Sequence, residues 1–402
     1  MLACPYCYNP CAEKEIVFRC TGRPGPEGVV CEVKRDEDLI RWLGISMPLP
    51  PAFEADGRRL SARCPHCQSE SPCRICPACH SRLPVDFGKV DSRLIALIGA
   101  KQSGKTVFMT VLIHELKHRL GRNLDLAIMG SDEATIRSFD KDYDDRLYRR
   151  HALPDPTLTS AARPLRQPLV FSLAMEQRRR LAPARERHTI LSFFDTAGED
   201  LNSTDSVELN LRYLSSAHAI ILLLDPLQMP GARAQARTGT ILPNPAEPGF
   251  DPPFNVLTRV TRLLRTPGPG QPAPRLYPGS RARPSGPIQT PVAVAFAKLD
   301  ALEHTLPRNS PLTRHPEPHR EFAAADSLAV HHQVQALLDE WDGPQIDQLM
   351  RHHYARYRYF GLSALGAPPL DPGTVSHIEP YRVHDPFLWL LSEFGIIPAG
   401  RG

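Results

Sequence analysis

The sequence lacks cysteine after residue 79, long apolar runs and a strong excess of either charge. Since no apolar run reaches about 18 residues, no membrane-spanning helix is predicted. The first residues, from Met1 to Pro5, lack the charged and apolar regions of a signal peptide. A net charge of +4 over 402 residues gives little reason to expect a nucleic acid or a membrane surface as partner. These absences predict a cytoplasmic globular protein that is long enough to bury a full core.

All ten cysteines lie in a cysteine-rich head that covers residues 1–84. In a cytoplasmic protein, such clustering favours metal ligands over disulfides. A Cys-Pro-x-Cys knuckle occurs at three places, namely Cys4 and Cys7, Cys64 and Cys67, and Cys76 and Cys79. Four thiolates from two such turns suit tetrahedral Zn²⁺. The sequence therefore predicts two closed, structural zinc sites, which a head this small needs in order to fold.

The cysteines can be paired in more than one way. The last two knuckles are separated by eight residues, so the simplest pairing places them in one site. Cys20 and Cys31 would then join the first knuckle, although Cys11 could replace either of them, and Cys73 is left over. The knuckle pairs could also be exchanged between the sites, and His66 or His80 could substitute for a cysteine. The expected ligands are Cys4, Cys7, Cys20, Cys31, Cys64, Cys67, Cys76 and Cys79.

From Arg93 onward, apolar runs of strand length alternate with segments of helical periodicity. This alternation predicts an α/β domain with a mostly parallel sheet flanked by helices. The expected strands are 94–98, 168–174, 189–194, 219–224, 292–297 and 357–362, and the expected helices are 107–120, 327–350 and 386–394. The stretch 132–160 is polar and reads as a mobile loop.

Residues 227–290 differ in composition, because Pro, Gly, Ala and Arg dominate them. Such a segment predicts a flexible insertion, here with one short helix near 255–264. The expected organisation is the head at 1–84, a first part of the α/β domain at 93–226, the insertion at 227–290 and a second part at 291–398.

A glycine-rich loop follows the first expected strand and matches the pattern G-x-x-x-x-G-K-[ST] between Gly99 and Thr106. Its backbone N–H groups can turn toward phosphate oxygens, and the helix behind the loop directs its positive end at them. Lys105 would reach the β- and γ-phosphates, and the Thr106 hydroxyl would ligate Mg²⁺. The expected phosphate-binding residues are Gly99, Lys101, Gln102, Ser103, Gly104, Lys105 and Thr106.

Two aspartates at strand ends compete for the magnesium ion. Asp195 begins the segment Asp195-Thr196-Ala197-Gly198, whose glycine N–H could turn onto the γ-phosphate. Asp225 ends a more apolar strand, but Pro226 follows it where many ATPases have a second carboxylate. We assign magnesium to Asp195, and Asp225 remains the alternative that a P-loop ATPase would use.

Two further segments indicate which base is bound. The Asp300 carboxylate, in Ala297-Lys298-Leu299-Asp300, can accept hydrogen bonds from guanine N1–H and the 2-amino group, which adenine does not offer. The wrong base would leave this carboxylate unpaired, so discrimination can be large. The Lys298 stem can lie over the purine ring. Ser363-Ala364-Leu365, after another strand, would bring a backbone N–H to guanine O6. GTP or GDP with Mg²⁺ is therefore the expected ligand.

Taken together, these segments resemble the Ras-like and translation-factor-like superfamily of P-loop GTPases over about residues 93–395. With the cysteine-rich head, residues 195–200 and residues 221–226, the chain more narrowly resembles bacterial double-GTPase proteins associated with biological conflict systems. The resemblance implies a switch in which GTP and Mg²⁺ order the segments around Thr157 and after Gly198. Thr159 is the alternative to Thr157. A protein effector or activator is the implied partner.

The chain departs from the superfamily pattern at several positions. Ala297 replaces an Asn or Thr, Glu199 replaces a glutamine that orients water, and Lys101 and Gln102 stand where glycines are common. These departures imply slow hydrolysis without an activator or oligomerisation. The expected catalytic residues are Lys105, Thr157, Gly198 and Glu199.

A second hypothesis is a binding module that holds nucleotide with negligible hydrolysis and acts through its zinc head. Nucleic acid is only weakly supported as a partner, because the head has mixed charges and few aromatic residues. The sequence does not determine the oligomeric state.

Overall fold

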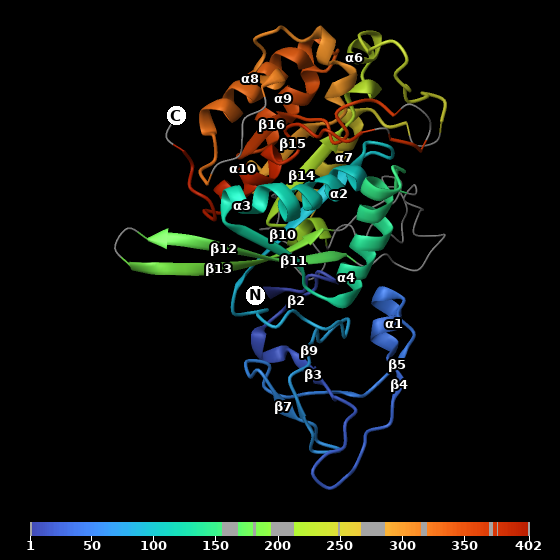
Figure 1. The fold of residues 1–402 in the computed structure, drawn as a ribbon, viewed down its shortest axis with the longest axis vertical. Helices are drawn as coiled ribbons and strands as arrows, with labels where there is room; N and C mark the ends of the chain where they lie inside the picture. The colour runs from blue at the N-terminus through green and yellow to red at the C-terminus, as the bar shows by residue number, and fades with distance from the viewer. Residues whose placement is uncertain are drawn as a thin grey trace, which may run out of the picture.

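The structure is a computed structural model that describes residues 2–154, 168–179, 182–193, 213–247, 250–266, 286–314, 320–369, 373–375 and 377–400. The cysteine-rich head lies at one end of the molecule and the α/β domain at the other (Figure 1). The N-terminus lies between them, beside the sheet of the α/β domain. Among the described residues, no helix is long and apolar enough to cross a membrane.

The described residues of the α/β domain contain a seven-stranded sheet in the order β11-β12-β13-β10-β14-β15-β16. Its strands are β10 (Asp91–Gly99), β11 (Leu126–Gly130), β12 (Leu169–Arg179), β13 (Ala182–Phe193), β14 (Ala219–Leu224), β15 (Val292–Phe296) and β16 (Tyr357–Gly361). The β10, β13, β14, β15 and β16 strands are parallel, whereas β12 pairs antiparallel with β11 and β13. All residues of β14 and β15 are buried, as expected for parallel strands that are covered on both faces. The expected mostly parallel α/β sheet is confirmed.

Helices cover both faces of this sheet. They are α2 (Lys105–Glu115), α3 (Gly121–Leu124), α4 (Glu133–Ser138), α6 (Pro230–Ala234), α7 (Pro253–Arg265), α8 (Ala324–Glu340), α9 (Pro344–His353) and α10 (Asp385–Glu393). π-Helical segments at Leu116–Leu120 and Phe139–Arg149 continue α2 and α4, and short 3-10 turns lie at Pro226–Gln228, Leu299–Ala301, Glu303–Thr305 and Pro311–Thr313. Alternate residues of β10 and β14 enter two separate apolar clusters, one with α2 and α10 and one with α7, α8 and α9.

Two expectations about these elements are wrong. The single helix expected over 327–350 is two helices, α8 and α9, because Gly343 and Pro344 interrupt the pattern. The loop expected over 132–160 is helical from Glu133 to Arg149, and β11 precedes it. Phe139, Tyr143 and Leu147 are buried at a spacing of four, which a polar composition conceals.

The segment expected as an insertion is partly built into the domain. Between β14 and residue 266 it forms α6 and α7, and α7 buries Val256, Leu257 and Val260 in the core. The expected helix near 255–264 is therefore present, and its apolar face packs into the core. The boundaries of the domains themselves stay a prediction.

The head consists of short strands around the cysteine knuckles. They are β1 (Leu2–Ala3), β2 (Pro10–Cys11), β3 (Val17–Arg19), β4 (Lys34–Arg35), β5 (Pro48–Leu49), β6 (Ala52–Phe53), β7 (Ala62–Arg63), β8 (Glu70–Ser71) and β9 (Arg74–Ile75), with the 3-10 turn Glu13–Glu15 and the helix α1 (Glu37–Leu43). β1 pairs with β2 around the first knuckle and β7 with β8 around the second. β3 pairs antiparallel with β6 and β9, which joins the first half of the head to the second.

Candidate nucleotide pocket and metal sites

A pocket of about 600 Å³ opens where β10, β14, β15 and β16 end. Its walls include residues 101–108 after β10, Leu227 after β14, residues 297, 298, 300 and 301 after β15, and residues 362–365 after β16. Ligands of α/β proteins commonly bind at the carboxyl ends of parallel strands. The structure thus brings the expected phosphate-binding loop and both expected base-binding segments to a single pocket.

The glycine-rich loop is shaped by close packing against the neighbouring strand. A Cβ atom on Gly99 would lie 2.3 Å from the Leu223 carbonyl oxygen and 2.6 Å from Ser103 Oγ. Gly104 has a φ of 87°, which favours glycine at the point where α2 begins. Lys105 is only 6% exposed, and its Nζ donates to the Gly99 and Ala100 carbonyl oxygens at 3.0 and 2.8 Å. The loop therefore holds the ammonium group at the end of the pocket where phosphates are expected.

Asp300 lies at the other end, where it is 5% exposed and accepts a hydrogen bond from Ser363 Oγ at 2.5 Å. Burial raises the pKa of its carboxyl group, while the Ser363 hydroxyl and the charge of Lys298 act in the opposite direction. A buried carboxylate with so few partners has capacity for further donors, such as those of guanine.

In the segment after β16, a side chain and the backbone N–H groups have different roles. The Ser363 N–H already donates to the Tyr381 carbonyl oxygen at 3.2 Å, so Ser363 serves to position Asp300. The N–H groups of Ala364 and Leu365 have no hydrogen-bond partner among the described residues, and both residues line the pocket. These two amides are therefore donors that a ligand in the pocket can use.

Asp225 has a role that sequence reasoning missed. It is 2% exposed, and its Oδ2 lies 2.6 Å from Lys298 Nζ while its Oδ1 accepts the Leu227 N–H at 3.0 Å. Each oxygen therefore already accepts a hydrogen bond, and Asp225 does not line the pocket. This arrangement argues against Asp225 as the magnesium ligand and makes it the residue that positions Lys298. The sequence contained part of this signal, because Asp225 and Lys298 follow two expected strands. These strands, β14 and β15, are adjacent and parallel, so the two residues lie at the same edge of the sheet.

Four expected site residues, Asp195, Gly198, Glu199 and Thr157, lie outside the described residues, as does Thr159. β13 ends at Phe193, two residues before Asp195, and it pairs in parallel with β10, which leads into the glycine-rich loop. Their roles in magnesium binding and hydrolysis stay predictions.

Sequence reasoning also missed part of the pocket wall. Residues 240–244 and Glu247, from the segment expected to be an insertion, line the pocket, as do Leu153, Pro154, residues 367–369 and Gly373. No nucleotide-binding motif includes these positions, so only the tertiary structure reveals them.

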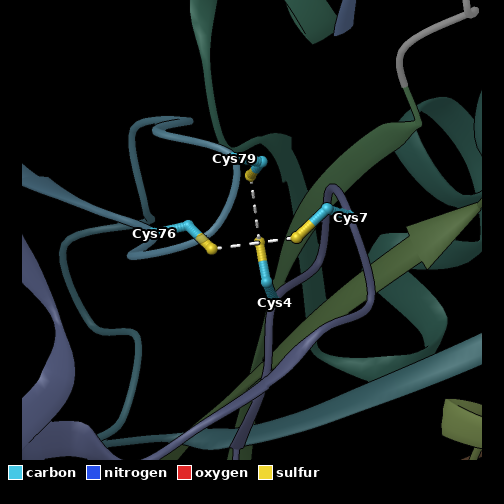
Figure 2. Close-up of side chains that lie close together, drawn as sticks. All are labelled: Cys4, Cys7, Cys76 and Cys79. Carbon is cyan, nitrogen blue, oxygen red and sulfur yellow. Dashed lines mark hydrogen bonds between the residues drawn. The ribbon is translucent and has the colours of Figure 1, made fainter. Parts of the chain in front are cut away.

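The cysteines form two groups of four, in each of which the sulfur atoms lie within 4.8 Å of one another. Figure 2 shows the first group, in which Cys4 and Cys7 face Cys76 and Cys79 from a second loop. In this group, sulfur–sulfur distances of 3.8 Å join Cys4 to Cys79 and Cys7 to Cys76. The second group is Cys20, Cys31, Cys64 and Cys67.

The knuckle pairs are therefore exchanged relative to the simplest expected pairing, as the stated alternative had it. The cause is the antiparallel pairing of β3 with β9, because Cys20 follows β3 and Cys76 follows β9. The two cysteines consequently lie at opposite ends of the small sheet. All eight expected ligands belong to the two groups, and Cys11 and Cys73 belong to neither. Burial raises the pKa of the Cys11 thiol to about 12, which keeps it protonated.

The knuckle geometry fits a bound metal ion. The residue after the second cysteine has a positive φ in all three knuckles, at Tyr8, Gln68 and His80. Its N–H donates to the carbonyl oxygen of the first cysteine at 2.9 to 3.0 Å. Backbone N–H groups also reach the sulfur atoms of Cys4, Cys20 and Cys76 at 3.4 Å. Donors to sulfur stabilise thiolates, and four thiolates suit Zn²⁺ in a closed site.

His80, which follows Cys79, was a possible substitute for a cysteine ligand. It is not in the first group of four, and its Nδ1 lies 2.9 Å from an Asp36 carboxylate oxygen.

The first cysteine group is joined to the α/β domain by Tyr8, which is 1% exposed and belongs to the same apolar cluster as Ala96 and Ile98 of β10. Its ring centroid lies 4.8 Å from that of Tyr213, whose hydroxyl accepts the Leu97 N–H at 2.9 Å. Ser192 of β13 donates to the Pro5 carbonyl oxygen at 2.7 Å. The first knuckle is thus part of the core that supports the strand leading into the glycine-rich loop.

A mostly parallel sheet with a glycine-rich loop before a helix, and a buried Lys-x-Asp turn at the same pocket, defines a P-loop protein of the GTPase type. The profile of the Double-GTPase 2 family matches residues 93–341, more than half of the chain. The chain belongs to the Double-GTPase 2 family, and the expected resemblance is confirmed.

A relative of known description is the putative ESX-1 scaffolding and assembly protein SaeC of Mycolicibacterium smegmatis. It is 28% identical over 375 residues, which cover 88% of this chain and 86% of that protein.

Solved structures with some likeness include the Arl6 small GTPase of Trypanosoma brucei, at 12% identity and a TM-score of 0.28, covering 76% of this chain and 99% of that one. Another is the GTPase-like domain of Ski7 from S. cerevisiae, at 10% identity and a TM-score of 0.29, covering 68% of this chain and 43% of that one. At TM-scores this low, neither likeness carries an argument about the site.

Proposed function

We propose that the chain binds GTP and GDP with Mg²⁺ and hydrolyses GTP slowly, as a switch that signals to a protein partner. The observation that carries this proposal is the single pocket that joins the glycine-rich loop to the buried Asp300 carboxylate. The loop supplies donors for phosphates, and Asp300 with the Ala364 and Leu365 amides supplies the pattern that complements guanine.

The residues of the pocket have distinct tasks in this proposal. Lys105 leaves the carbonyl oxygens of Gly99 and Ala100 to contact the β- and γ-phosphates, and the Thr106 hydroxyl and Asp195 hold Mg²⁺, which neutralises phosphate charge. Water attacks the γ-phosphorus, the bond to the bridging oxygen of the β-phosphate breaks, and GDP and inorganic phosphate result. Glu199 in place of a water-orienting glutamine, and Ala297 in the base motif, favour a low intrinsic rate.

The head supplies two structural Zn²⁺ sites, each held by one of the two groups of four cysteines. The identity of the partner is a further part of the proposal. The description of the relative from M. smegmatis as a scaffolding and assembly protein supports a protein partner in the assembly of a larger complex. A role in biological conflict, which the narrower family resemblance implies, is an alternative setting for the same switch.

The test compares the binding of GTP, GDP and ATP to the purified protein, followed by phosphate release under single-turnover conditions. We expect guanine nucleotides to bind at least tenfold more tightly than ATP, and Asp300→Ala to remove that preference. Lys105→Ala should abolish both binding and phosphate release. Equal affinity for ATP and GTP would contradict guanine recognition, whereas tight GTP binding without any release would favour the binding-module hypothesis.

A further inference from the structure

Residues 240–244, which lie between α6 and α7, form a wall of the pocket that no nucleotide-binding motif assigns. We call this segment, Thr240-Ile241-Leu242-Pro243-Asn244, the 240–244 wall. It belongs to the stretch whose composition predicted a flexible insertion, yet the structure places it in the same pocket wall as the residues expected to recognise the base.

Hydrogen bonds hold the 240–244 wall near the base end of the pocket. The Arg237 N–H donates to the carbonyl oxygen of Ala301, the residue after Asp300, at 2.9 Å. The Thr240 N–H in turn donates to the Arg237 carbonyl oxygen at 3.0 Å. From α6, the Arg233 guanidinium donates to the Pro243 carbonyl oxygen. The wall is therefore tied to the turn that carries Asp300.

The chemistry of the wall suits the nucleoside half of a ligand. Ile241 and Leu242 are large apolar residues that remain 53% and 37% exposed while lining the pocket. When apolar side chains around a pocket pack on an apolar ligand surface, such as a purine face, the removal of this surface from water favours binding. Residues 240–247 contain no lysine or arginine, and Glu247, which also lines the pocket, would repel phosphate.

Thr240 provides a polar contact at the same place. Its Oγ1 is buried and has no hydrogen-bond partner among the described residues. A buried hydroxyl without a partner costs free energy, which a donor or acceptor on the ligand would recover.

We propose that the 240–244 wall is a nucleoside subsite, in which Ile241 and Leu242 pack on the purine and ribose and Thr240 hydrogen-bonds to a polar atom of the nucleoside. The inference rests on the proposed function in requiring that the pocket holds a nucleotide. It adds that nucleoside affinity depends on a segment outside the phosphate and base motifs.

The experiment measures the dissociation constants of GDP, GTP and ATP, all with Mg²⁺, for the full chain and three variants. The variants are the double substitution Ile241→Ser with Leu242→Ser, Thr240→Val, and the control Leu328→Ser. Leu328 is 44% exposed on α8 and does not line the pocket, so it matches the apolar exposure of the wall. Thermal unfolding without ligand checks that each variant is folded. Ile241, Leu242 and Leu328 are exposed, and Thr240→Val removes a buried hydroxyl that has no partner among the described residues, so we expect all variants to fold.

The double variant should lose about tenfold in affinity for GDP and for GTP alike, which corresponds to about 1.4 kcal/mol. Thr240→Val should lose about threefold, and the control should match the unmodified chain. Equal losses for GDP and GTP support the subsite, because both ligands share the nucleoside. Unchanged affinities, or a loss confined to GTP, would overturn it. If the chain prefers ATP but loses ATP affinity in the double variant, guanine recognition fails and the nucleoside subsite stands.

Discussion

At the scale of single residues, the proposed function depends on a few buried charged groups that have different surroundings. Asp300 is buried at the base end of the pocket and has a raised pKa, whereas Asp225 is buried in an ion pair with Lys298. The former lines the pocket and can accept donors of a ligand, whereas the latter does not line the pocket and already accepts from Lys298 and the Leu227 N–H. Their different roles follow from their partners, because both are aspartates at the ends of parallel strands.

Asp300 makes the stability of the ligand-free protein depend on pH. Its pKa is higher in the folded protein than the value of about 4 for an unfolded aspartate, so the folded state binds the proton more tightly. The free energy of unfolding should therefore decrease as pH rises from about 4 through the raised pKa. Asp300→Asn removes this titration. The free energy of unfolding of the variant minus that of the unmodified chain should therefore increase as pH rises over that interval. Denaturant unfolding of both proteins at several pH values measures the difference, and a difference that is independent of pH would contradict the assignment.

Asp225→Asn tests the second aspartate. Loss of the negative charge releases Lys298 Nζ, whose side chain is 34% exposed, and the lysine stem is no longer fixed at the wall of the pocket. We expect about tenfold weaker binding of GDP with Mg²⁺ and a similar loss when Mg²⁺ is replaced by a chelator. If Asp225 were the magnesium ligand, the loss would appear only in the presence of Mg²⁺. Titrations of GDP with and without Mg²⁺ distinguish the two roles.

At the scale of elements, the packing of β10 against β14 sets the shape of the glycine-rich loop. Gly99→Ala would place a methyl group 2.3 Å from the Leu223 carbonyl oxygen, which belongs to the backbone of β14. The two strands must separate to admit it, at a cost of about 1–3 kcal/mol. We expect a lower midpoint of thermal unfolding together with loss of nucleotide binding.

Gly239→Ala is the control for that contact. Gly239 has a φ of 88°, whereas Gly99 is not among the glycines of positive φ, and the methyl group added at Gly239 would meet no atom within 4 Å. The loss of stability at Gly239 therefore measures backbone strain without a close contact, and the loss at Gly99 measures the close contact. An unchanged midpoint of thermal unfolding in Gly99→Ala would contradict the effect of the contact with β14.

At the scale of the whole molecule, the two cysteine groups relate differently to the α/β domain. The first group is followed by Tyr8, which packs into the core beside β10, whereas the second group lies in a cluster formed by residues of the head alone. Metal at the first group should therefore support the α/β domain, and metal at the second should support the head.

Cys4→Ser and Cys64→Ser form a matched pair that tests this difference. Metal analysis should find two zinc ions in the unmodified chain and one in each variant. Cys4→Ser should lower the unfolding temperature of the α/β domain and weaken GDP binding, because Tyr8 loses its support. Cys64→Ser should leave GDP binding within about twofold. Equal effects of the two substitutions on GDP affinity would contradict the placement of the first group in the domain.

The sequence by itself determined the parts whose signals are local. Buried strands read as apolar runs, the glycine-rich loop as a spacing of glycines and a lysine, and six of the eight grouped cysteines as three short knuckles, because each pattern spans a few neighbouring residues. Only the tertiary structure decided which knuckles lie together in one group of four cysteines, that Asp225 pairs with Lys298, and that residues 240–244 line the same pocket as the expected base motif. These features depend on strand order and direction, which bring together residues far apart in the chain. The composition of a polar or proline-rich stretch does not indicate which distant residues it contacts, so these features could not be predicted from it.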